Sequence, residues 1–130
     1  MKKKKGFTLI ELIIVIAILA LLIAIAIPRY QRSNLSAQAT AHNANVRVIK
    51  NAAILYSMDK PTEGTIELDD LKPYLESGEV PTPAKALSQY TSFTVKVENG
   101  NIVVEPGMVK IGNNNTLVVD TDKSDQAKQK

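Results

Sequence analysis

Glu11 occupies the position in this sequence where chemistry is most expected. It is the single charged residue in a 21-residue stretch, Phe7 to Ile27, that is otherwise almost entirely apolar. A carboxylate at the centre of a membrane helix costs about 2.5 to 3.5 kcal/mol on insertion scales, and such groups usually have a partner. The stretch contains no lysine, arginine or histidine, so the sequence predicts a partner from outside it.

Enzymatic chemistry is not supported by the rest of the composition. The chain has 130 residues, one histidine and no cysteine, which excludes disulfides, thiolate nucleophiles and cysteine-ligated metals. No nucleophile, base and orienting group can be combined into a catalytic set. We expect no enzyme activity, no cofactor and no catalytic residue.

Positive charge is concentrated at the N-terminus. Lys2 to Lys5 carry four of the sixteen basic side chains, and without the first six residues the balance is twelve basic against thirteen acidic. A nucleic-acid-binding surface is therefore not indicated, and no specific nucleic acid partner is inferred.

The apolar stretch has the length of a membrane span. A 21-residue helix is about 31 Å long, which matches a hydrocarbon core of about 30 Å. Four lysines precede the span and only Arg29 and Arg32 closely follow it, which predicts a cytoplasmic N-terminus. A secretory signal cleaved after Ala26 and a plain anchor are the alternatives; the length of the run argues against the first, and Glu11 against both.

The segment from Lys5 to Leu12, Lys-Gly-Phe-Thr-Leu-Ile-Glu-Leu, resembles the type III signal sequence of type IV pilins and pseudopilins. The resemblance implies that a prepilin peptidase cuts after Gly6, so that 1–6 is a removed leader, and that Phe7 becomes an N-methylated N-terminus. It places Glu11 at the fifth mature position, and Pro28 at the family's usual helix kink.

What the resemblance implies about function is a structural subunit of a type IV pilus. Before assembly the chain would cross the plasma (inner) membrane once, and after assembly it would form an extracellular helical filament. Its expected partners are other copies of itself, the prepilin peptidase/methyltransferase and the pilus assembly platform. The alternative is a pseudopilin of a type II secretion or DNA-uptake system. The absence of cysteine puts a pilin of the disulfide-loop kind in doubt.

Cleavage after Gly6 would also supply the missing partner of Glu11. The new α-amino group of Phe7, with a reference pKa of about 7.7 to 8.0, could pair with Glu11 within one subunit or between neighbours. A mismatch in register would leave both charges unpaired, which costs several kcal/mol. We therefore expect this pair to set the stagger of subunits while apolar packing provides cohesion.

Helical periodicity continues beyond the membrane span. We expect a kink rather than a stop at Pro28, because a stripe with helical spacing follows it. The stripe consists of Ala37, Ala41, Ala44, Val48, Ala52 and Leu55, widened by Ile49, Ala53 and Tyr56. We predict that this stripe packs on the globular domain and that His42, beside it, is a surface or interface residue.

The C-terminal part is predicted to be a small antiparallel sheet domain, which makes the fold class α+β. The pattern indicates a short helix over 68–75 interrupted by Pro73, and strands over 92–98, 102–105, 108–111 and 116–120, with an Asn99-Gly100 hairpin turn. We expect one meander of three or four strands. The expected regions are 7–27 (membrane and assembly helix), 28–58 (amphipathic continuation), 59–120 (globular domain) and 121–130 (flexible tail).

Three aspartates near the C-terminus raise the question of calcium. Asp120, Asp122 and Asp125 are oxygen ligands, but the spacing lacks the glycine and the bidentate glutamate of an EF-hand. A solvated chain end is the favoured interpretation, so we expect no metal site.

Overall fold

The structure is a computed structural model that describes residues 6–120 of the chain. Its longest element is α1, Leu9–Asp59, which runs through Pro28 without interruption. The chain divides into two compact units, up to Asn34 and from Leu35 onward, and each is described by itself. The kink at Pro28 stays a prediction, because an uninterrupted helix does not by itself establish a bend of the helix axis at this proline.

The first unit exposes its apolar side chains. Every described residue up to Asn34 is exposed, and the large apolar residues of α1 from Leu9 to Ile27 are about half exposed or more. Within the described chain, α1 is the one helix long and apolar enough to cross a membrane, and none of that apolar window is buried. The predicted candidate membrane helix is therefore confirmed, and its side chains need lipid or other copies to cover them.

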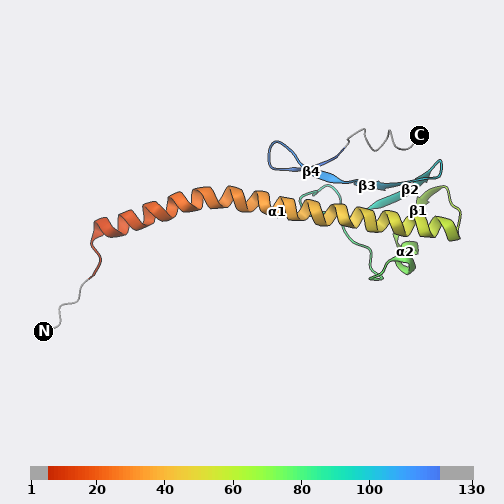
Figure 1. The fold of residues 1–130 in the computed structure, drawn as a ribbon, viewed down its shortest axis with the longest axis horizontal. Coiled ribbons are helices and arrows are strands. Elements are labelled where there is room, and N and C mark those ends of the chain that lie inside the picture. Colours follow the sequence, from red (N-terminus) through yellow and green to blue (C-terminus); the bar gives the residue numbers. More distant parts are fainter. Residues whose placement is uncertain (1–5, 121–130) are drawn as a thin grey trace. The chain divides into compact units, whose positions relative to one another are not determined.

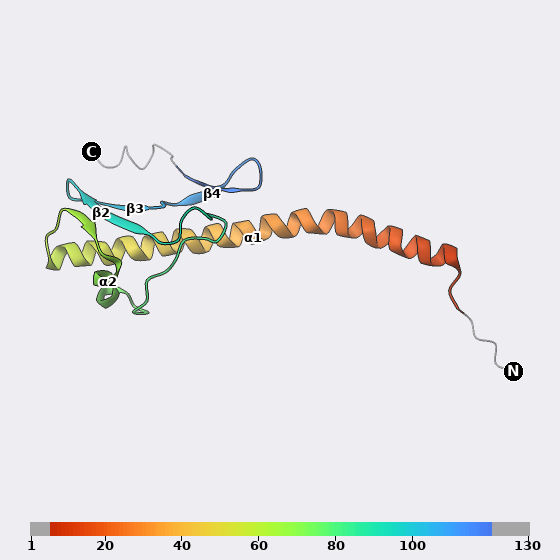
Figure 2. The ribbon, with the colours of Figure 1, turned by 180° about the vertical axis from the view of Figure 1, so that it is seen from behind.

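The second unit combines the C-terminal half of α1 with two small antiparallel sheets. Figures 1 and 2 show these strands along one side of that part of the helix. The first sheet has the order β1-β2-β3, with Val95 opposite Val104, and the second pairs β4 with β5. The strands are β1 Gly64–Ile66, β2 Thr94–Glu98, β3 Asn101–Glu105, β4 Val109–Ile111 and β5 Leu117–Val119. The predicted α+β class is confirmed.

The prediction of a single meander is wrong in two respects. The strands form two sheets, because Pro106 follows β3 directly and has no N–H to extend a ladder. The strand β1 was not predicted. It has only three residues and begins at Gly64, within a segment whose proline and glycine indicate a loop.

Other local predictions are confirmed. The short helix appears as α2, Leu68–Leu71, followed by a 3₁₀ turn, Lys72–Tyr74, at Pro73. Between β2 and β3, Asn99 and Gly100 have φ of 53° and 80°. Two positive φ values are the requirement of a type I′ hairpin, which is why Asn-Gly predicted it.

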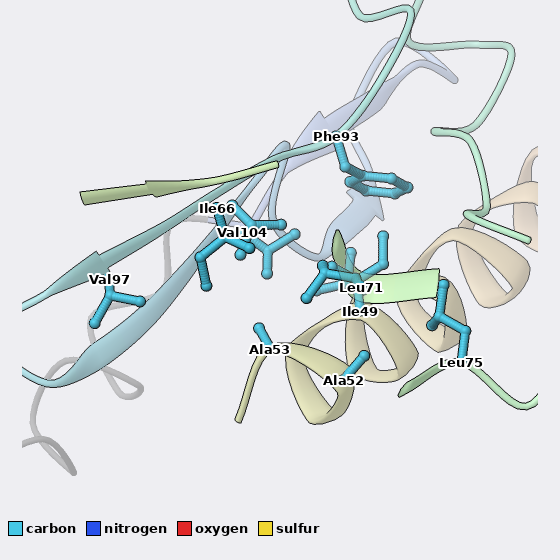
Figure 3. Packing of buried hydrophobic residues seen from close by; sticks show 11 residues of the cluster. Ile49, Ala52, Ala53, Ile66, Leu71, Leu75, Phe93, Val97 and Val104 are labelled. Carbon is cyan, nitrogen blue, oxygen red and sulfur yellow. The ribbon is translucent and has the colours of Figure 1, made fainter. Parts of the chain in front are cut away.

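The core of the second unit lies between α1, the three-stranded sheet and α2. Figure 3 shows Ile49, Ala52 and Ala53 of α1 facing Ile66 and Val104, with Leu71 of α2 close by. Ile49, Ala53, Leu71 and Val95 have no measurable exposed surface. A smaller cluster of Ala39, Leu87, Val109 and Leu117 lies under the second sheet. The helix therefore supplies one wall of both clusters.

The face of α1 that packs on this core coincides with the predicted stripe and its widening only at Ile49, Ala52 and Ala53, with Tyr56 partly buried against the core. The buried residues are Ala39, His42, Val46, Ile49, Ala52 and Ala53. Of the six predicted stripe positions, five are exposed: Ala37, Ala41, Ala44, Val48 and Leu55. Both sets have helical spacing, and the five exposed residues together are named the exposed stripe.

Candidate processing and assembly site

The bond between Gly6 and Phe7 lies in a non-helical segment ahead of α1. Both residues are exposed, and the Phe7 side chain is 87% exposed. A Cβ added to Gly6 would meet nothing within 4 Å, and Gly6 does not require a positive φ. Packing in the described chain therefore does not explain a glycine here. The lysines at 2–5 lie outside the described residues.

Glu11 caps its own helix. The Thr8 hydroxyl accepts a hydrogen bond from the Glu11 backbone N–H at 3.2 Å, and the Glu11 carboxylate accepts one from the Thr8 backbone N–H at 3.4 Å. This reciprocal pair is a capping box, whose sequence signature is Thr-x-x-Glu. Glu11 thus has an ordinary structural role besides its expected assembly role, and the Thr8 to Glu11 spacing was the signal that could have shown it.

The carboxylate of Glu11 keeps an incomplete set of partners. It forms no ion pair within residues 6–120, and the single bond that it accepts is long. Charge-assisted hydrogen bonds are usually about 2.7 to 2.9 Å long. The bond of 3.4 Å from the Thr8 N–H is longer, so it compensates the charge of the Glu11 carboxylate only in part. The geometry leaves capacity for a cation close to the start of the helix.

A polar cluster that the sequence did not reveal holds the C-terminal half of α1 to the other segments of the second unit. Gln38 Oε1 accepts a hydrogen bond from the Ala86 N–H at 3.0 Å. Asn43 bonds both backbone groups of Val109, accepting from its N–H at 2.7 Å and donating to its carbonyl at 3.0 Å. Gln38 and Asn43 thus provide hydrogen-bond partners for backbone groups of Ala86 and Val109 that no neighbouring strand pairs.

His42 is the buried member of this cluster, so of the predicted surface or interface position the surface alternative is wrong. Its side chain is 1% exposed, and its ring lies 5.2 Å from that of Phe93, centroid to centroid. Nδ1 accepts from the Ala84 N–H at 3.1 Å, so Nε2 carries the proton that it donates to the Gly107 carbonyl at 2.9 Å. This assignment of the tautomer follows from the network. The role is structural, because backbone groups occupy both nitrogens.

The C-terminal end of α1 is fixed by an aromatic cluster. The Tyr74 hydroxyl donates to Asp59 at 2.8 Å, and the Tyr74 and Tyr56 rings meet edge to face at 5.9 Å. The hydrogen bond to Asp59, more than burial, raises the pKa of Tyr74 above its ordinary value of 10.0. Lys60 lies 5.8 Å from the centre of the Tyr56 ring. The cluster joins the 3₁₀ turn that follows α2 to the end of the long helix.

Metal-binding clusters are absent from the residues that the structure describes: no group of three His, Cys, Asp or Glu side chains could hold an ion there. Asp120 lies 3.6 Å from Lys110. Asp122 and Asp125 lie outside the described range, as does the predicted tail at 121–130, so the structure does not test the calcium alternative.

Comparisons with known proteins agree with the N-terminal motif. A family model described as the prokaryotic N-terminal methylation motif matches residues 1–27. Two proteins of Pseudomonas aeruginosa, each named fimbrial protein, are 53% identical to this chain over 53 residues, which is 41% of this chain and 34% of theirs. Fimbrial protein EcpB of Eikenella corrodens is 63% identical over 38 residues, 29% of this chain and 24% of its own.

These matches confirm the resemblance to the type IV pilin family and its N-methylation motif. The matched segments span between 24% and 34% of the length of these curated relatives. No solved structure matches the chain. The likeness to fimbrial proteins therefore supports a pilin-type subunit, and the remaining chain has to be interpreted from its own structure.

Proposed function

We propose that this chain is a prepilin, cleaved after Gly6, N-methylated at Phe7 and polymerised into a type IV pilus. The observation that carries the proposal is the match of residues 1–27 to the N-terminal methylation motif. The exposed, non-helical Gly6–Phe7 bond supports it, because a peptidase needs an extended and accessible segment. The fimbrial relatives support a structural role rather than a catalytic one.

Membrane insertion comes first in this proposal. The apolar half of α1 crosses the plasma membrane with the N-terminus in the cytoplasm, where the leader is removed and Phe7 is methylated. The second unit lies on the outer side. Assembly then transfers the exposed apolar side chains from lipid to a bundle of neighbouring helices, and the assembled filament is extracellular. An assembly platform in the membrane performs the transfer.

Charge pairing gives the assembly its register. After cleavage, the methylated amine of Phe7 is a cation within a few residues of Glu11, whose carboxylate has unfilled capacity. In the proposed filament the amine of one subunit pairs with Glu11 of a neighbour. Removing one partner of a buried charge pair costs about 3 to 5 kcal/mol, so the pair strongly favours one axial position over others.

The capping box provides a way to separate the two roles of Glu11. Glutamine can replace glutamate in a capping box, so Glu11→Gln keeps the cap and removes only the charge. Thr8→Ala has the opposite effect, because it removes the hydroxyl that caps the Glu11 N–H and keeps the carboxylate. The two variants are a matched pair on one helical turn.

The experiment compares filament yield in sheared cell-surface material, with intact mass and N-terminal sequencing of the subunit. We expect the wild-type subunit to begin at methylated Phe7. Glu11→Gln should insert in the membrane normally and lower filament yield about tenfold or more, consistent with the loss of a buried pair. Thr8→Ala should change yield much less, since a lost cap costs about 1 kcal/mol.

Two results would contradict the proposal. A mature wild-type protein that retains its lysines at 2–5 would show that processing after Gly6 does not occur. Normal filaments from Glu11→Gln would show that the charge has no role in assembly and that the capping box explains the residue.

A further inference from the structure

We propose that a notch beside α1 receives Arg29 and Arg32 of a second copy of this chain. The notch has a volume of about 560 Å³ and is lined by Asn45 and Val48 of α1 and by the connector from Glu76 to Pro81. This inference rests on the proposed function, because it names the surfaces through which the subunits of that filament would meet.

The acidic lining of the notch forms no ion pair in the part of the chain that the structure describes. Glu76 and Glu79 both line it, and neither forms an ion pair within residues 6–120. They belong to a segment, 59–79, with seven acidic and two basic side chains. Of those two bases, Lys72 pairs with Asp69 and Lys60 lies by the Tyr56 ring. Glu76 and Glu79 are therefore two notch carboxylates without an ion-paired base in the described residues.

The complementary charge lies on α1. Arg29 and Arg32 are the only Lys, Arg, Asp or Glu side chains between Glu11 and Arg47. Three residues apart on a helix, they share one face, and both are exposed with no ion pair within the described residues. Guanidinium groups suit carboxylates because their donors form paired hydrogen bonds. The two glutamates and the two arginines are thus matched in number and in charge.

The exposed stripe is a surface on which a neighbouring helix can pack beside the notch. Ala37, Ala41, Ala44, Val48 and Leu55 form a line of helical spacing that is exposed, with nothing in residues 6–120 covering it. Val48 belongs both to the stripe and to the lining of the notch. The small side chains of the stripe would let a second helix approach closely. A copy that packs along it brings its own helix charges beside Glu76 and Glu79.

Opposite charges at this contact would select one neighbour position over others. Complementary charge raises the specificity of an interface more than its affinity. The proposed notch contact is therefore a second interaction, besides the Phe7 and Glu11 pair, that fixes the axial position of neighbouring subunits. It lies outside the apolar bundle. A continuous alanine-rich stripe alone would tolerate a slip of one helical turn, and the carboxylate and guanidinium pairs would not.

Charge reversal and charge exchange test the inference in cells that assemble the full chain. The notch reversal is Glu76→Arg with Glu79→Arg, and the arginine reversal is Arg29→Glu with Arg32→Glu. We expect each to lower sheared filament yield about tenfold, and the chain that carries all four changes to return to within about threefold of wild type, as for interfaces selected by charge. The matched control is Glu63→Arg with Asp70→Arg, which reverses two exposed carboxylates of the same acidic segment away from the notch and should leave yield nearly unchanged.

Disulfide trapping gives an independent measurement, because the chain has no cysteine of its own. Ser33→Cys with Ser77→Cys places one thiol beside Arg32 and one in the notch lining, and oxidation of filaments should produce covalent multimers. Ser33→Cys with Ser88→Cys is the control, since Ser88 is exposed outside the notch, and should produce none.

The outcomes separate this inference from the proposed function. If wild-type chains form no filaments, both fail. If wild type assembles and the notch reversal assembles like its control, only the notch contact is refuted. A reversal that weakens filaments without recovery in the four-site exchange, or without multimers in the trapping experiment, also overturns it, because the glutamates would then serve another ligand.

Discussion

Replacement of His42 by alanine is expected to destabilise the second unit more than any change on the exposed faces of α1. The imidazole is 1% exposed and connects three segments that are distant in sequence: the helix, the connector at Ala84 and the turn at Gly107. The side chain is therefore a structural bridge, although its residue type first suggests a ligand or a proton switch.

The magnitude follows from the groups that lose a partner. Without the ring, the Ala84 N–H and the Gly107 carbonyl remain in place with no acceptor or donor, and each buried unsatisfied group costs about 1 to 3 kcal/mol. The ring also contacts Phe93, so its removal leaves a cavity. A total of about 3 to 5 kcal/mol is a large part of the 5 to 15 kcal/mol that typically stabilises a domain.

Denaturant unfolding of the full chain in detergent micelles measures the effect through the near-ultraviolet signal of the packed tyrosines. Hydrogen exchange at the Ala84 amide locates it, because this N–H should lose protection in His42→Ala. Thr40→Ala is the control on the same helix; its exposed hydroxyl bonds only the Ser36 carbonyl, and its effect should be within about 0.5 kcal/mol. Equal stability of the two variants would refute the bridging role of His42.

Three further predictions concern single sites. The pKa of Tyr74 is raised in the folded state, chiefly by its bond to Asp59, so its contribution to stability is present below about pH 10 and is lost as pH rises through the folded pKa. Tyr74→Phe should remove this alkaline dependence, as monitored by denaturant unfolding across that range. Gly100→Ala should cost about 1 to 2 kcal/mol in the same assay, because φ is 80° there, with no clash to explain a larger loss. Gly6→Ala should leave stability unchanged and lower the fraction of subunits that begin at Phe7, as measured by N-terminal sequencing.

Local features of the fold were predictable because each depends on a few adjacent residues. The Asn99-Gly100 turn requires two positive φ values, and asparagine followed by glycine is the pair that adopts them. The long helix follows from an uninterrupted apolar run and a periodic continuation. The motif around Gly6 and Glu11 is likewise contiguous, so its resemblance to pilins could be found without coordinates.

The features that were missed depend on partners far away in sequence. His42 is 42 residues from Ala84 and 65 from Gly107, and no local pattern indicates that both would present backbone groups to it. Whether β4 would join the first sheet also depended on the chain path after Pro106. The capping box is the exception, since Thr8 and Glu11 stand three residues apart and their spacing alone is its signature.

Two apolar faces compete on the second half of α1, and hydrogen bonding decides which of them enters the core. By hydrophobicity alone, the face with Ala37, Ala44 and Leu55 is as good a candidate as the one with His42 and Ile49. The buried face, however, is flanked by the side chains that satisfy the backbone of the connector and of β4, which lack strand partners at those points. Burial of the other face would leave these groups unpaired at a cost of about 1 to 3 kcal/mol each. The helix consequently keeps its alanine-rich face exposed, where the proposed filament would need it for packing against other copies of the chain.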